Sequence, residues 1–243
     1  MSLQTRKLTM AMALLSVLGS ASKLVTAEEK ASLSPQVELW GLQEITLNCA
    51  SIPGNPFSDV NLQATFTNHD STAKVDGFHD GSSTWRIRFM PDREGKWSFQ
   101  TKSSETSMDG KSGTFSVGPP STGNHGPVGV NNTYHFSFAD GTPYFLLGTT
   151  SYNWLNRDDA LQERTLATLR AKPFNKLRFG LFPKWFVFNR VEPSIFPYLR
   201  KEDGTFDLER FDTRFFAKVE ARIRQLDELG IQADIILFHP YDK

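Results

Sequence analysis

The sequence predicts an N-terminal all-β immunoglobulin-like sandwich, followed by the first part, about three βα units, of an incomplete α/β TIM barrel. Three observations indicate this fold. Short runs of alternating apolar and polar residues, separated by Gly, Asn, Asp, Ser and Pro, fill residues 37–117. A stretch rich in Gly and Pro follows at residues 118–126. Beyond it, apolar strands alternate with segments of helical period, which is typical of a parallel sheet.

The composition excludes several classes of protein. The chain has 243 residues, with 27 Lys and Arg against 27 Asp and Glu, and one cysteine. A hydrophobic fraction of 39% is enough for a substantial core, so we do not expect global disorder. The balanced charge provides no broad basic face, and nucleic acid is therefore not an expected partner. Cys49 cannot form an internal disulfide, and its alternation with Ile45 and Leu47 predicts a buried apolar role.

Residues 1–27 are predicted to be a secretory signal peptide. Arg6 and Lys7 precede an apolar run at residues 8–18, which is too short to span a membrane, and the small side chain of Ala27 suits signal peptidase. We therefore expect a secreted or periplasmic protein that has no membrane partner after cleavage. The alternative is an uncleaved N-terminal anchor.

The predicted sandwich covers residues 35–118. Its expected strands lie at residues 37–40, 44–47, 61–66, 84–89, 96–101 and 114–117, with Asp-Gly turns at 76–81. Alternation places Trp85 with Ile87 on one face and favours a core role for Trp40, Trp85 and Trp97. A sugar-stacking platform is the alternative for these three residues.

Residues 119–132 are the predicted linker, and residues 133–243 are the predicted N-terminal part of the barrel. A hairpin is expected across Asp140 and Gly141, between residues 134–138 and 144–147. The expected parallel strands and helices are a strand at 144–150, a helix at 157–172, a strand at 175–181, a helix at 212–229 and a strand at 231–238. Pro173 ends the first helix and Gly230 caps the second. Because no Gly-rich phosphate-binding motif follows a strand, a dinucleotide fold is disfavoured and no cofactor is expected.

The candidate substrate-binding residues follow the predicted parallel strands, because the active site of a parallel barrel lies at the carboxyl ends of its strands. These residues are Tyr152, Asn153, Trp154, Arg178, Lys184, Trp185, His239, Tyr241 and Asp242. Together they offer aromatic faces for stacking, donors for sugar hydroxyls and a cation that keeps a carboxylate ionised. Each has a structural alternative: loop packing for the two tryptophans, a buried structural role for His239 and an ion pair for Arg178.

Several short motifs carry a resemblance to a known family. They are VELW at 37–40, GFHDG at 77–81, RFMP at 88–91, FNKLR at 174–178, FPK at 182–184 and IILFHPYD at 235–242. In this order they resemble a bacterial immunoglobulin-like domain of unknown function that precedes a glycoside-hydrolase-like barrel of the apiosidase-like type. The resemblance implies that Arg178 neighbours a nucleophilic carboxylate and that His239 lines a sugar subsite. The resemblance also implies a general acid/base that follows an Asn-Glu pair, and a nucleophilic Glu on a later strand. The sequence ends before either residue.

Hydrolysis of a glycoside needs two carboxyl groups, about 5 Å apart for retention and further apart for inversion. Only Asp242 lies at a predicted rim position, so no catalytic residue is assigned. The expected function is that of the N-terminal portion of an exported glycoside hydrolase-like protein, acting on poly- or oligosaccharides and inactive as this fragment. The alternative is a non-catalytic carbohydrate-binding or interaction module. A metal-dependent hydrolase that uses His239 and Asp242 lacks further ligands at suitable spacing, so no metal is expected.

Overall fold

The computed structural model of the chain describes residues 36–50, 52, 54–184 and 191–238. The predicted signal peptide at residues 1–27 lies outside the described residues, as do four candidate site residues, namely Trp185, His239, Tyr241 and Asp242. Within the described part, no helix combines the length and the apolar character that crossing a membrane requires.

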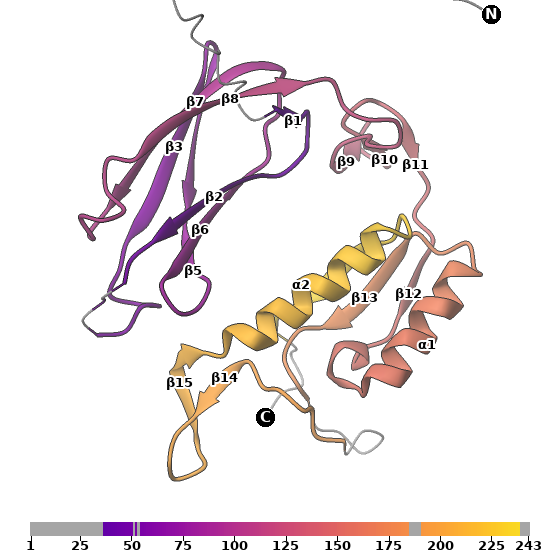
Figure 1. Cartoon of the computed structure of the whole chain (residues 1–243). Helices are drawn as coiled ribbons and strands as arrows, with labels where there is room; N and C mark the ends of the chain where they lie inside the picture. The colour runs from indigo at the N-terminus through magenta and orange to yellow at the C-terminus, as the bar shows by residue number, and fades with distance from the viewer. Residues whose placement is uncertain (1–35, 51, 53, 185–190, 239–243) are drawn as a thin grey trace, which may run out of the picture. The chain divides into compact units, whose positions relative to one another are not determined.

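Residues 36–118 form two β-sheets (Figure 1). One has the strand order β1-β8-β7-β3-β4 and the other the order β2-β6-β5. Neighbouring strands are antiparallel, except that β1 runs parallel to β8. The strands are β1 (Gln36–Glu38), β2 (Gln43–Asn48), β3 (Leu62–Asn68), β4 (Ser71–Asp76), β5 (Phe78–His79), β6 (Thr84–Phe89), β7 (Gly95–Ser103) and β8 (Ser112–Gly118).

Alternate residues of both sheets meet in one apolar core. Phe66 of β3 and Phe89 of β6 stack with their ring centroids 4.2 Å apart. Trp85 and Trp97 are buried, which confirms the predicted core role for these two residues. The core also contains Cys49, so its predicted buried role is confirmed. These two sheets therefore form a sandwich, which we call the sandwich below.

A small antiparallel sheet follows, with the strand order β11-β10-β9. Its strands are β9 (Val128–Asn131), β10 (His135–Phe138) and β11 (Pro143–Tyr144). The predicted hairpin is confirmed, because Phe136 pairs with Tyr144 and Gly141 turns the chain at φ +90°. Strand β9 lies within the residues predicted to be a linker.

Residues 148–184 and 191–238 are called the α/β segment below. Three parallel strands in the order β12-β13-β16 form its sheet, and β14 pairs with β15 as an antiparallel hairpin. Its elements are β12 (Gly148–Thr150), the 3₁₀ helix η1 (Trp154–Asn156), α1 (Asp159–Arg170), β13 (Lys176–Gly180), β14 (Tyr198–Arg200), β15 (Phe206–Phe211), α2 (Thr213–Asp227) and β16 (Gln232–Ile236).

Local capping explains where the two α-helices begin and end. An oxygen of Asp158 accepts a hydrogen bond from the backbone N–H of Leu161 at 2.9 Å, and an oxygen of Asp212 accepts one from that of Arg214 at 3.0 Å. Gly230 follows α2 with φ +68°, a conformation that favours glycine after a helix. Both helices lie where the sequence predicts them.

Both helices pack on one face of the parallel sheet. Leu177 and Phe179 of β13 point to this face and share a buried cluster with Leu166 of α1 and Phe215 of α2. The intervening Lys176 and Arg178 point to the opposite face, and no helix of the described residues covers them. The α/β segment therefore presents one apolar, covered sheet face and one polar, open face.

The prediction of a partial TIM barrel with about three βα units is wrong. The described residues are mostly β-strand in small sheets, with two α-helices, and they form no closed barrel. The apolar run at residues 144–150 predicts one strand covered on both faces, but Tyr144 belongs to β11 and only Gly148–Thr150 pairs with β13. Phe145 between them is 84% exposed. Apolar content alone does not determine which strand a residue pairs with.

Candidate functional site

The carboxyl ends of β12, β13 and β16 lie side by side, and this edge is the candidate site. The backbone N–H of Gly180 donates to the carbonyl of Tyr152 at 2.8 Å, and that of Leu181 donates to the carbonyl of Ile236 at 3.0 Å. The segments that follow the three strands are therefore neighbours. Ligands bind at this edge in open parallel sheets generally.

Of the candidate residues, Tyr152 and Lys184 lie in the segments that follow β12 and β13. Tyr152 is 56% exposed and Lys184 is half-buried. Asn153 carries a buried amide nitrogen with no hydrogen-bond partner among the described residues. A buried donor of this kind is costly unless something accepts its hydrogen bond.

Trp154 lies in the core, and its contacts agree with a structural packing role and not with ligand binding. It is 1% exposed, and its indole N–H donates to the carbonyl of Gln162 at 3.2 Å. Its ring meets that of Phe179 edge to face, with the centroids 5.3 Å apart. No face of this indole is available to a ligand.

An ion-pair cluster lies on the open face of the parallel sheet. Arg178 and Asp234 are opposite each other in the register of β13 and β16, and Arg178 Nε donates to Asp234 Oδ2 at 2.8 Å. Lys176 Nζ lies 3.2 Å from the same oxygen. Burial opposes ionisation of Asp234, but the hydrogen bonds from Arg178 and Lys176 outweigh it and lower the pKa of this carboxyl below its ordinary value. Asp234 therefore remains ionised and holds Arg178 in place.

Asp234 is absent from the residues predicted from the sequence. The only signal was a single acidic residue inside an apolar strand. Its partner lies 56 positions earlier in the chain, so the pairing depends on the register of two strands.

A row of four aromatic rings begins at the same edge and was also not predicted. Phe182, after β13, stacks with Tyr198 at a centroid distance of 6.1 Å and with Phe238 at 6.1 Å. Tyr198 in turn stacks with Phe211 of β15 at 5.2 Å. Phe238 is 84% exposed, so one ring at the end of the row is open to a ligand. Aromatic faces are suited to the C–H faces of pyranose rings.

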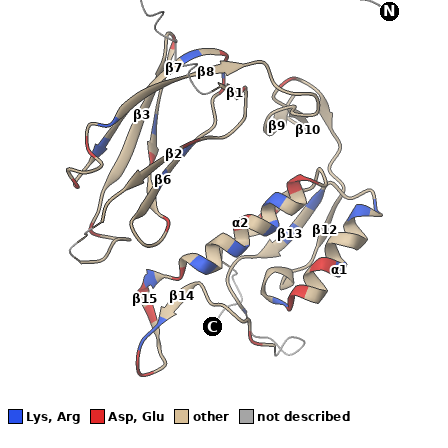
Figure 2. Cartoon of the chain, viewed as in Figure 1, with Lys and Arg blue, Asp and Glu red and all other residues tan. Residues whose placement is uncertain are grey.

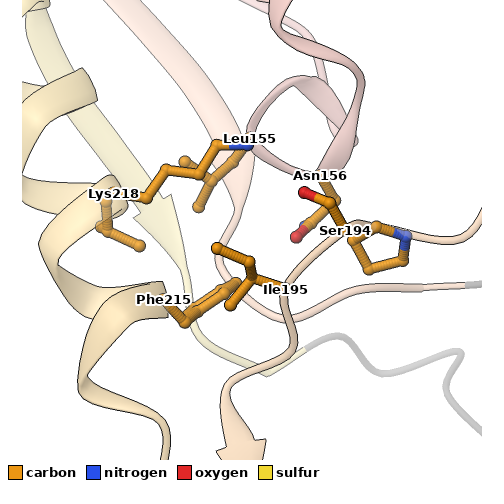
Figure 3. Close-up of a pocket in the computed structure, with 8 residues that line it drawn as sticks. Leu155, Asn156, Ser194, Ile195, Phe215 and Lys218 are labelled. Carbon is orange, nitrogen blue, oxygen red and sulfur yellow. The ribbon is translucent and has the colours of Figure 1, made fainter.

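A small pocket lies between η1 and α2 (Figure 3). It is lined by Leu155, Asn156, Pro193, Ser194, Ile195, Phe215, Lys218 and Val219. The volume open to the centre of a water molecule is about 10 Å³, which accommodates one water but no sugar. Asn156 Oδ1 is buried without a hydrogen-bond partner among the described residues and suits such a water. The pocket is therefore not a substrate site.

The described residues contain no group of three or more His, Cys, Asp or Glu side chains placed to hold a metal ion. The strands β12, β13 and β16 contain one carboxylate, Asp234, and it is paired with two cations.

Comparison with known proteins gives the following similarities. Residues 36–104 match a domain of unknown function, DUF5060. The chain is 42% identical to a "putative glycoside hydrolase" from Bacteroides vulgatus ATCC 8482 whose crystal structure is known, with a TM-score of 0.80 over 86% of this chain and 42% of that one. No curated protein sequence matches the chain.

Two further solved structures are much less similar. One is described as a glycoside hydrolase, at 17% identity and a TM-score of 0.33 over 46% of this chain and 25% of that one. The other is a family 39 glycoside hydrolase from Bacteroides cellulosilyticus WH2, at 10% identity and a TM-score of 0.25 over 85% of this chain and 32% of that one. The similarity to the Bacteroides vulgatus protein makes the chain glycoside-hydrolase-like, and the chain spans less than half of that relative.

Proposed function

We propose that the chain is the N-terminal portion of an exported glycoside hydrolase-like protein that acts on poly- or oligosaccharides. The observation that carries this proposal is the 42% identity to the Bacteroides vulgatus protein, together with a TM-score of 0.80 over 86% of this chain. A glycan is the substrate class that this relationship suggests. The exposed aromatic groups at the strand ends support it.

The glycan-binding surface in this proposal is the edge where β12, β13 and β16 end. Tyr152 and Phe238 provide exposed rings there, and Arg178 provides guanidinium donors on the adjoining sheet face. Aromatic rings and a few fixed polar donors are the usual components of a small-molecule site. Asp234 fixes the Arg178 side chain and thereby reduces the entropy lost when a sugar hydroxyl binds.

Within the proposal, this chain binds sugar but does not hydrolyse it. Hydrolysis needs two suitably placed carboxyl groups, and the single carboxylate of the parallel strands, Asp234, already neutralises two cations. A reducing-sugar assay on the chain is expected to show no release. If the chain releases sugar and the Asp234→Asn variant does not, the proposal that this chain lacks hydrolytic activity is wrong.

The domain boundaries proposed from the sequence are 1–27, 35–118, 119–132 and 133–243, with export directed by the first segment. N-terminal sequencing of material recovered outside the cytoplasm is expected to begin after Ala27. A sequence that begins at Met1 would show that the segment is not removed.

Calorimetric titration with a panel of soluble polysaccharides tests glycan binding. We expect Tyr152→Ala and Phe238→Ala each to weaken binding about ten-fold, because each removes an exposed stacking face. Tyr134→Ala is the control, since Tyr134 is 87% exposed, close to the 84% of Phe238, but lies between β9 and β10. The proposal is wrong if no glycan releases heat, or if the control weakens binding as much.

A further inference from the structure

We infer that the outer face of the β2-β6-β5 sheet is a docking surface for α2 and β15, so that the sandwich supports the α/β segment instead of acting as a separate binding module. This inference goes beyond the proposed function. The outer face is the one that points away from the sandwich core. It carries Glu44 of β2 together with Arg86 and Arg88 of β6, which alternate with the buried residues of those strands.

The centre of the surface is a two-pronged ion pair between Arg88 and Glu220 of α2. Arg88 Nη1 donates to Glu220 Oε1 at 2.6 Å, and Nη2 donates to Oε2 at 3.0 Å. The remaining Arg88 Nε donates to Glu44 Oε2 at 2.8 Å. One guanidinium thus joins a carboxylate of the sandwich to a carboxylate of the α/β segment. Only arginine has the planar fork that this geometry requires.

The sandwich holds Arg88 ready for this contact. The guanidinium lies over the ring of Phe78, 5.0 Å from its centroid, and Glu44 is itself bound by Arg86. Burial opposes the ionisation of Glu44, but the hydrogen bonds from Arg88 and Arg86 keep its pKa below the ordinary value. The hydrogen bonds that Arg88 donates to Glu220 raise the pKa of the guanidinium. Glu44 and Arg88 are therefore both charged at neutral pH.

The charge distribution of α2 makes the pairing specific. The helix carries four basic residues, Arg214, Lys218, Arg222 and Arg224, but only two acidic ones, Glu220 and Asp227 at its end (Figure 2). Lys218 and Arg222 pair with Asp159 of α1. The one acid in the middle of a basic helix is therefore the residue that meets Arg88.

Two further segments of the sandwich extend the surface. Asn55 Nδ2 donates to the carbonyl of Glu209 in β15 at 2.8 Å, and the ring of Phe57 meets that of Phe211 edge to face at 5.4 Å. At Gly81, a Cβ atom would lie 2.9 Å from Thr213 Oγ1 at the start of α2. Because α2 and β15 contact Arg88, Asn55 and Phe57, we infer that this face does not serve as a glycan-binding platform.

A double-mutant cycle in the full chain tests the inference. In urea unfolding, Arg88→Gln and Glu220→Gln are each expected to lower the equilibrium constant for folding about five-fold or more. If the two side chains interact, the double variant should lower this constant about five-fold less than the two single effects multiplied together. Arg93→Gln is the control, because Arg93 pairs with the adjacent exposed Asp92 and should change the constant less than about two-fold. Independent effects of the two substitutions would overturn the inference.

Hydrogen exchange supplies a second readout. If α2 docks on the sandwich, Glu220→Gln should speed amide exchange in β5 and β6 as well as in α2. Exchange that changes in α2 alone would show that Glu220 acts only within its own helix and would overturn the inference. If Arg88→Gln does not fold, Arg88→Lys replaces it in the double-mutant cycle, because lysine retains the charge but lacks the two parallel N–H donors of the guanidinium. The same results then support or overturn the inference.

Discussion

Replacing Trp154 with alanine separates a core role from a ligand-binding role for this residue. The side chain is 1% exposed, its ring packs against Phe179, and its indole N–H donates to the Gln162 carbonyl. Truncating a buried tryptophan leaves a cavity and costs about 3–5 kcal/mol of unfolding free energy. Trp154→Phe retains much of the ring but removes the donor, and we expect a loss of about 1–3 kcal/mol.

Thermal and urea unfolding followed by far-ultraviolet circular dichroism provides the assay. For a protein of this size, each kcal/mol shifts Tm by roughly 2–4 °C, so Trp154→Ala should lower Tm by roughly 10 °C. Tyr152→Ala is the control. Tyr152 lies two positions earlier and is 56% exposed, so its loss should cost less than about 0.5 kcal/mol.

The result that would refute this reasoning is a Trp154→Ala variant with the Tm of the wild type and weakened glycan binding. Such a variant would show that the indole contacts ligand and that its burial contributes little to stability. A loss of stability in Tyr152→Ala equal to that in Trp154→Ala would also refute it, since exposure would then fail to distinguish the two positions.

Two further predictions concern packing and pH. Gly77→Ala would place a Cβ 2.5 Å from Leu62 Cδ2, so we expect overpacking to cost about 1–3 kcal/mol in urea unfolding; an unchanged midpoint would contradict this packing. For Asp212, the hydrogen bond from Arg214 lowers the pKa in the folded state below its value of about 3.9 in the unfolded chain. The resulting stabilisation is complete above pH of about 4 and is lost as the pH falls through the folded pKa, so Asp212→Asn should flatten the acid limb of a stability profile between about pH 2 and 6. If the wild type and Asp212→Asn lose stability identically as the pH falls, the ionised Asp212 carboxylate does not stabilise the fold.

The parts of the fold that the sequence predicted correctly are those that depend on local signals. The two α-helices are recognisable from their helical period and from Pro173 and Gly230 at their ends, which act through neighbouring residues. The β10-β11 hairpin was recognisable from its Asp-Gly turn. In contrast, residues 144–150 combine part of one strand, an exposed stretch and a second strand, and hydrophobicity does not separate these three.

The candidate site was predicted only in outline. The rule that ligands bind where parallel strands end depends on strand order, and it located the segment of Tyr152 correctly after β12. It did not identify the Arg178–Asp234 pair or the stacking of Phe182 on Tyr198, because each joins residues that meet only after the chain has folded. The same rule could not distinguish Trp154 from an exposed neighbour, since the chain turns inward within two residues of Tyr152.

The position of the buried indoles makes the chain its own optical probe. Trp85 and Trp97 lie in the core of the sandwich, and Trp154 lies in the core of the α/β segment. An indole in a dry apolar core emits at a shorter wavelength than one in water, so each core reports its own opening through a red shift. Fluorescence spectra of the wild type and of Trp154→Phe would therefore show whether the two cores open together or in sequence, without any attached dye.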